Sequence, residues 1–156
     1  MGTLETEKSF QPLETRIESA TTFEKLAEIA LDEISKMPKP VGIVSGPITS
    51  GGLGSMEANL AELSKQIHDL QDQNKSIFNQ MPYEPKMQEI KKTPYHDATR
   101  DHLLEVFYGT LYGSGLIEEF YFLPGWESSY GAKWEHDQLK KIGAKIIYLD
   151  LQLSKK

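Results

Sequence analysis

The sequence predicts an α/β protein: a flavodoxin-like or Rossmann-like parallel sheet of four to five strands flanked by helices. Short apolar runs alternate with longer segments in which apolar residues recur every three or four positions. Strands that alternate with helices form a parallel sheet, because each helix returns the chain to the start of the next strand. Turns rich in Gly, Pro and Ser follow two of the apolar runs, where α/β proteins place their ligands.

Length and composition indicate one soluble domain. The 156 residues suit a single domain, expected over residues 20–156, after a flexible or loosely docked arm of residues 1–19. No apolar run approaches the roughly 20 residues of a membrane span and no signal peptide is visible, so we expect a cytoplasmic protein without a membrane partner. The net charge of −6 argues against nucleic acid polymers, and the absence of cysteine excludes disulfides and thiolate chemistry.

The first half of the chain predicts helix, strand, helix and strand. Thr21 and Glu24 form a capping-box pattern before a helix over residues 22–37, which the prolines at 38 and 40 end. Residues 41–45 are a buried strand, and Ser55 caps a second helix that Asn74 ends. A short strand follows over residues 76–80. The apolar faces of the two helices are formed by Phe23, Leu26, Ala30, Ile34 and Met37, and by Met56, Leu60, Leu63, Ile67 and Leu70.

The second half begins with residues 81–97, where three prolines indicate a long loop or lid. A helix is expected over residues 97–112, with the glycines at 113 and 115 at its end. A strand over 119–123, a helix over 130–141 that Gly143 ends, and a final strand over 145–149 complete the sheet.

The two glycine-rich turns, Gly46–Ser55 and Pro124–Gly131, are expected at the same edge of the sheet, where helix N-termini can bind a phosphate or sugar. The first turn lacks the lysine of a phosphate-binding loop and the spacing of a dinucleotide fingerprint. An ordinary flexible connection therefore stays open as the alternative.

Glu135 is the candidate working residue of the second turn. It follows Gly131 by four residues, so on a helix the two share one face and the glycine leaves space before the carboxylate. The alternative is a solvated glutamate favoured by the helix dipole. Trp134 is similarly either a stacking platform or a packing residue.

Two other kinds of chemistry are not indicated. The four histidines match no zinc-binding spacing, so no metal or other cofactor is expected. Ser128 and Ser129 lack the Gly-x-Ser-x-Gly elbow of serine hydrolases, and their alternative role is helix capping.

The segment LPGWESSYGAKWEHDQLKKIGAKIIYL, with VGIVSGPITSGG, resembles the nucleoside 2-deoxyribosyltransferase-like superfamily. It resembles in particular a branch with a GP-I/M-T loop and a pGWe-S-x-GA-x-x-E motif. The resemblance implies a flavodoxin-like sheet, assembly into homodimers or higher homo-oligomers, and cleavage of the N-glycosidic bond of a nucleoside or nucleotide. It places Glu135 at the position of the nucleophile, which attacks the anomeric carbon and forms a glycosyl ester.

Ser129 distinguishes branches of this superfamily. Transferases acting on free nucleosides are similar in having an aspartate six residues before the nucleophile, whereas hydrolases of nucleoside 5′-monophosphates have a serine there, beside a glycine that matches Gly131. A hydroxyl and backbone amides accept a phosphate dianion, which an aspartate would repel. The hypothesis is therefore a nucleotide N-glycosidase.

The resemblance also implies an acid that protonates the leaving base, for which Asp101 is the candidate and Asp97 the second. Where the hydrolases have a phosphate-binding arginine, this chain has Ile48, Thr49 and Ser50. The substrate-binding residues expected beside Glu135 are Ser45, Gly46, Pro47, Ile48, Thr49, Gly125, Trp126, Ser128, Ser129 and Gly131.

Two other functions stay open. A nucleotide sensor or interaction module could use the same pocket without catalysis. An NAD-type glycohydrolase is the third possibility, since related folds attack nicotinamide ribosides with a similarly placed glutamate. Base and sugar specificity, and hydrolysis against transfer, are not decided by these residues.

Overall fold

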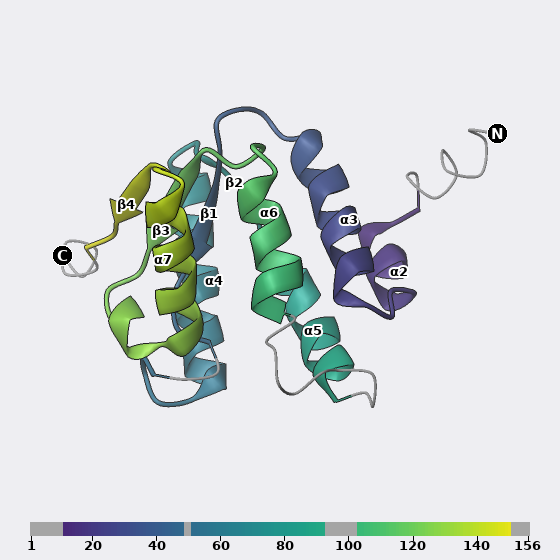
Figure 1. Cartoon of the computed structure of the whole chain (residues 1–156), viewed down its shortest axis with the longest axis horizontal. Coiled ribbons are helices and arrows are strands. Elements are labelled where there is room, and N and C mark those ends of the chain that lie inside the picture. The colour runs from purple at the N-terminus through teal and green to yellow at the C-terminus, as the bar shows by residue number, and fades with distance from the viewer. Residues whose placement is uncertain (1–10, 49–50, 93–102, 151–156) are drawn as a thin grey trace.

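Four parallel strands form one sheet in the order β2-β1-β3-β4 (Figure 1). They are β1 (Val41–Ser45), β2 (Ser76–Ile77), β3 (Glu119–Phe122) and β4 (Ile146–Tyr148). The computed structural model describes residues 11–48, 51–92 and 103–150. Gly42 of β1 pairs with both neighbouring strands, opposite Ile77 and Glu119. The α/β class and the parallel sheet are confirmed, with four strands in the described part of the chain.

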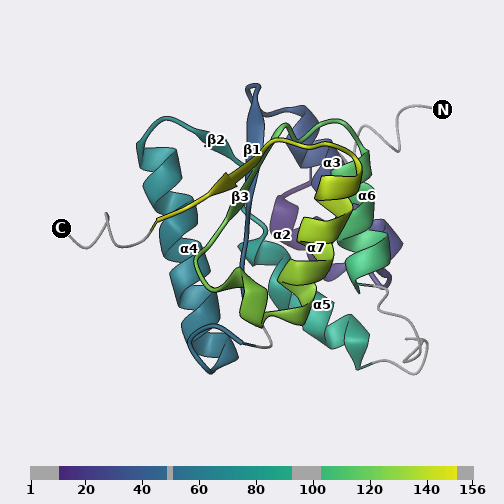
Figure 2. The ribbon, with the colours of Figure 1, turned by 60° about the vertical axis from the view of Figure 1, so that its left-hand side comes forward.

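Helices cover both faces of this sheet. Figure 2 shows α4 on one side and α3, α6 and α7 on the other. The helices are α2 (Leu13–Glu18), α3 (Phe23–Ser35), α4 (Met56–Asp72), α5 (Glu84–Lys91), α6 (Gly109–Gly113) and α7 (Tyr130–Lys141), with the 3-10 turns η1 (Met81–Tyr83) and η3 (Trp126–Ser128) and the π-helical segment η2 (Leu103–Tyr108).

Alternate residues of the strands supply two separate cores, because successive side chains of a strand point to opposite faces. Val44 and Leu123 pack with Leu63 and Ile67 on the α4 side. Their neighbours, among them Phe122, belong to the larger core on the other side. The side of the sheet on which a strand residue lies therefore follows from its place in this alternation.

Several predicted elements are confirmed with small shifts. The helix over 22–37 is α3, but the residue that caps it is Thr22, whose Oγ1 accepts from the Lys25 amide at 3.1 Å; the expected cap at Thr21 was wrong. Ser55 caps α4 through the Ala58 amide, as expected. The strand expected over 76–80 is shorter, since pairing ends at Ile77.

The long loop or lid expected over 81–97 was wrong for its described part. Residues 81–91 form η1 and α5, and Tyr83, Met87 and Ile90 are buried. Pro85 lies in the first turn of α5, where a proline is tolerated because the amides there have no intrahelical acceptor. Residues 93–97 lie outside the described part.

Part of the expected N-terminal arm is docked. Helix α2 packs with Ile17 buried, and Arg16 donates to Asp32 and Glu33 of α3, at 2.9 Å to each carboxylate. The Arg16 side chain is only 11% exposed. The folded unit therefore includes residues 13–18, and residues 1–10 lie outside the described part.

Candidate functional site

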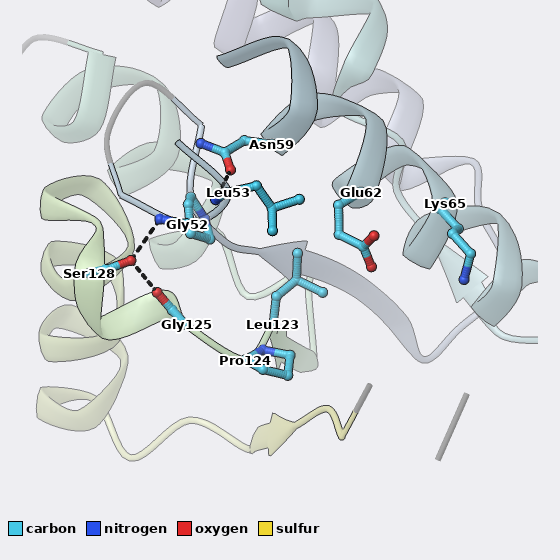
Figure 3. A pocket seen from close by; sticks show the side chains of 10 residues that line it. Gly52, Leu53, Asn59, Glu62, Lys65, Leu123, Pro124, Gly125 and Ser128 are labelled. Atoms are coloured by element: carbon cyan, nitrogen blue, oxygen red, sulfur yellow. Dashed lines mark hydrogen bonds between the residues drawn. The ribbon is translucent and has the colours of Figure 1, made fainter. Parts of the chain in front are cut away.

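The two glycine-rich turns meet at the carboxyl edge of the sheet (Figure 3). The Gly52 amide donates to Ser128 Oγ at 2.8 Å, and the same hydroxyl donates to the Gly125 carbonyl at 2.6 Å. Gly51 has a φ of +68°, and a Cβ there would lie 2.2 Å from the Ser128 carbonyl oxygen. The turns are thus joined at a contact that only glycine permits at position 51.

The Asn59 side chain of α4 hydrogen-bonds the backbone of the first turn. Its Oδ1 accepts from the Leu53 amide at 2.8 Å, and its Nδ2 donates to the carbonyls of Ile48 at 3.0 Å and Gly51 at 3.2 Å. The side chain is buried, so these bonds satisfy backbone groups that would otherwise lose water without replacement. Asn59 therefore holds the described backbone of the turn at Ile48, Gly51 and Leu53.

A cavity of about 480 Å³ lies beside these turns on the α4 side of the sheet. Three predicted substrate-binding residues, Pro47, Gly125 and Ser128, line it together with Leu123. Figure 3 shows the Glu62 and Lys65 side chains of α4 along the same cavity. Glu135 does not line it, so the structure divides the predicted site residues between two places.

Glu135 lies on the other side of the sheet, beside Ser45 and Tyr112. Ser45 follows Val44 in β1 and therefore points away from α4. Its hydroxyl lies 3.2 Å from the Tyr112 hydroxyl, and both side chains hydrogen-bond the Glu135 carboxyl. All three residues are buried, Glu135 to 7% exposure. The solvated-glutamate interpretation of Glu135 is therefore wrong.

Burial dominates the ionisation of this carboxyl. Desolvation raises the pKa of Glu135 to about 8, although the hydrogen bonds from Ser45 and Tyr112 lower it, and the charge of Glu84 raises it further. Burial likewise raises the pKa of the Tyr112 phenol well above its usual range. Burial therefore favours the protonated form of Glu135 at neutral pH, beside the hydroxyls of Ser45 and Tyr112.

Ser129 begins α7, the helix that carries Glu135. Its Oγ accepts from the Ala132 amide at 3.2 Å, so it is the helix N-cap. Ser129 is 3% exposed, and Gly131 follows it in the first turn. The capping role expected as the alternative is present, and the hydroxyl hydrogen of Ser129 stays available as a donor.

The aromatic residues of the motif pack against the protein. Trp126 stacks on His136, with ring centroids 4.1 Å apart, and lies near Tyr148 of β4 at 6.2 Å. Trp134 packs against the core on the Glu135 side. The packing interpretation of Trp134 is supported, and Trp126 connects the motif to the edge strand.

Of the remaining predicted residues, Gly46 approaches Leu123 so closely that a Cβ would lie 2.7 Å from that side chain. Ile48 packs against the α4-side core. Thr49, Asp101 and Asp97 lie outside the described residues, so the expected general acid stays a prediction.

Three residues in the region of Glu135 were not predicted from the sequence: Tyr112, Tyr108 and Glu84. The rings of Tyr108 and Tyr112 have centroids 6.0 Å apart, and the Tyr108 hydroxyl donates to Glu84 Oε2 at 3.2 Å. The available signal was the four-residue spacing of the two tyrosines, which places both on one helix face. Their hydroxyls distinguish this face from a purely apolar one.

Metal-binding clusters and membrane-spanning helices are both absent from the described ranges. No cluster of three or more His, Asp or Glu side chains with the geometry of a metal site is present in them. No helix in these ranges has the length and apolarity needed to cross a membrane.

Comparison with known proteins gives one match. A family model described as a domain of unknown function (DUF4406) matches residues 96–148, about a third of the chain. No curated protein and no solved structure matches the chain. The matched part includes Tyr112, Ser129 and Glu135, so three residues of the described site fall within one family segment whose activity is unassigned.

Proposed function

We propose that the chain cleaves or transfers the N-glycosidic bond of a nucleoside or nucleoside 5′-monophosphate, with Glu135 as the nucleophile. The observation that carries the proposal is the carboxyl of Glu135, buried at the edge of the sheet and hydrogen-bonded by Ser45 and Tyr112. Burying a carboxyl costs free energy that hydrogen bonds only partly offset, and strongly perturbed acids gather at functional sites.

The proposed reaction has two steps. Once Glu135 has released its proton, a carboxylate oxygen bonds to the anomeric carbon as the bond to the base breaks, and the base takes up a proton from a general acid or from water. Water, which gives up a proton to the solvent or to the same acid's conjugate base, or a second base then displaces the ester and restores the carboxylate. The hydroxyls of Ser45 and Tyr112 hold the attacking group in one orientation, which reduces the entropy lost on reaching the transition state.

Ser129 and the first amides of α7 are proposed to bind the 5′ end of the substrate. The helix N-terminus favours an anion there, and Ser129 retains a donor after capping. In this proposal the protein works in the cytoplasm as a homodimer or higher homo-oligomer, as the superfamily resemblance implies.

The test is release of free base from the purified full chain. Nucleosides, nucleoside 5′-monophosphates and NAD are incubated with the wild type, with Glu135→Gln and with Glu127→Gln, and the products are separated by chromatography. Glu127 is an exposed glutamate of the same motif and serves as the matched control. We expect base release with the wild type and E127Q and none with E135Q. No release from any substrate, or release by E135Q, would refute the proposal.

A second candidate is a non-catalytic nucleotide-binding protein. The observation in its favour is that Glu135 is 7% exposed and mostly protonated at pH 7, whereas a nucleophile must be accessible and ionised. It predicts a higher melting temperature in the presence of a nucleotide without base release. Nicotinamide release from NAD in the same screen would identify a glycohydrolase instead.

A further inference from the structure

A second carboxyl, Glu84, is buried in the same region as Glu135. It begins α5, is 3% exposed and accepts a hydrogen bond from Tyr108 at 3.2 Å. The proposed reaction assigns no role to Glu84. Burying a carboxyl costs free energy unless hydrogen bonds or nearby charges compensate for the lost water.

Tyr108 and Tyr112 connect Glu84 to Glu135. Tyr108 donates to Glu84, and its ring centroid lies 6.0 Å from that of Tyr112, which hydrogen-bonds Glu135. The charges of both carboxyls act on the buried Tyr108 hydroxyl. The two acids therefore lie in one polar cluster enclosed by core, where charges interact over longer distances than in water.

The surroundings of the two acids differ. Glu84 has the Tyr108 hydroxyl and the positive charge of Lys91 to favour its ionised form, against the desolvation that raises its pKa. The described groups that act on Glu135 are the neutral hydroxyls of Ser45 and Tyr112 and the charge of Glu84. When the cluster carries one negative charge, that charge is therefore on Glu84.

We propose that Glu84 is a positioning residue for Glu135: its negative charge, stabilised by the hydrogen bond from Tyr108, adds to the effect of burial and so raises the pH at which Glu135 becomes a nucleophile. Two carboxyls that share a site cannot easily ionise together, so one is kept neutral. The effect on turnover rests on the proposed N-glycosidase function, whereas the effect on the protonation of Glu135 does not.

The test measures Glu135 directly. The full chain is labelled with glutamate carrying ¹³C at the carboxyl, and the Glu135 resonance is assigned as the one absent from E135Q. Its titration midpoint is followed by NMR in the wild type and in Glu84→Gln. Removal of the Glu84 charge should shift the midpoint to lower pH, because Glu135 then ionises without repulsion.

Two further variants keep the test decisive. Glu89→Gln, an exposed position on the same helix, removes the same net charge and should leave the midpoint unchanged. Tyr108→Phe removes the donor to Glu84 and so lowers the charge of Glu84; it should also shift the midpoint to lower pH, and it serves if E84Q does not fold. An unchanged midpoint in the folded variants, or an equal shift in E89Q, would overturn the proposal.

The readouts separate this inference from the proposed function. If the chain releases base, the midpoint of kcat/KM against pH should move with the NMR midpoint in E84Q. If no base is released but the NMR midpoint moves, the proposed reaction fails and the role of Glu84 in the protonation of Glu135 stands.

Discussion

The Ser45 hydroxyl lies 3.2 Å from the Tyr112 hydroxyl, and this contact joins the end of β1 to the helix that precedes the motif strand. The two residues are 67 positions apart in the chain. Both also hydrogen-bond Glu135 from α7. Three separate elements thus converge on one carboxyl, and this convergence makes the ionisation of Glu135 sensitive to changes in each element.

Tyr112→Phe should raise the pKa of Glu135, because it removes a hydrogen bond that lowers this pKa. The NMR midpoint of Glu135 should move to higher pH, opposite to the shift expected for E84Q. Where base release is measurable, kcat/KM at pH 7 should fall. Tyr121→Phe is the control, since Tyr121 is a buried tyrosine on the α4 side of the sheet; a shift there as large as in Y112F would contradict the expectation.

Glu135→Gln should change how stability depends on pH. The folded-state pKa of Glu135 is about 8, above its ordinary value of 4.5. Between these values the unfolded chain has released this proton and the folded chain has kept it, so the contribution of Glu135 to stability falls as pH rises from about 4.5 to 8, by roughly 3–5 kcal/mol. E135Q has no titrating group at this position, so its free energy of unfolding does not include this decrease with pH.

The measurement is urea unfolding of the wild type and E135Q across that range. The stability of E135Q relative to the wild type should increase with pH and level off above pH 8. E127Q should follow the wild type at every pH, because Glu127 is exposed. A constant difference between E135Q and the wild type would show that Glu135 titrates normally in the folded protein. Burial also makes Gln a better test than Ala, which would leave a cavity.

Gly51→Ala should separate the two turns. A Cβ at this position would lie 2.2 Å from the Ser128 carbonyl oxygen, which belongs to the backbone and cannot rotate away. The variant should lose about 2 kcal/mol or more of stability, as expected for backbone strain with a steric clash. Thermal unfolding and hydrogen exchange of the Gly52 amide are the measurements.

The control for G51A is Gly54→Ala. Gly54 also has a positive φ, +96°, but nothing lies within 4 Å of a Cβ there. It should show only the cost of the left-handed backbone, about 1 kcal/mol. Equal losses in the two variants would mean that the contact with Ser128 contributes nothing.

Arg16→Ala should release α2 from α3. Arg16 is bonded to both Asp32 and Glu33 at 2.9 Å, and these carboxylates are about one third exposed, so the expected loss is modest, about 1–2 kcal/mol. Faster amide exchange should be confined to α2. Lys25→Ala breaks an exposed pair with Glu28 and should change little; protection of α2 that survives in R16A would show that Ile17 docks the helix alone.

Elements with strong local patterns could be predicted from the sequence, and those decided by distant contacts could not. Strand β1 and helix α7 were predicted because an apolar run and a helix cap are patterns formed by residues close together in the sequence. Helix α5 was missed because it has few apolar residues and its prolines indicated a loop. Its buried face, with Met87 and Ile90, is explained by the core that covers it.

The candidate site was likewise predictable where it depends on local sequence and not where it depends on distant contacts. Glu135 could be found from its motif, but its burial could not, because Ser45 and Tyr112 come from other elements. The prediction that both turns lie at one edge of the sheet agrees with the contact between Gly52 and Ser128. The prediction of one site was incomplete, because Ser128 lines the cavity on the α4 side whereas Glu135 lies beside Ser45 and Tyr112 on the opposite side.

The cap of α7 has a consequence for how this protein could be redesigned. Aspartate caps a helix about as well as serine, because its carboxylate also accepts from the amides of the first turn. Exchange of Ser129 for aspartate would keep an acceptor for the Ala132 amide, but it would also place a carboxylate at a buried position. If the proposed function holds, this single substitution would replace a hydroxyl that can donate to a phosphate with a carboxylate that repels one, while the cap of α7 remains.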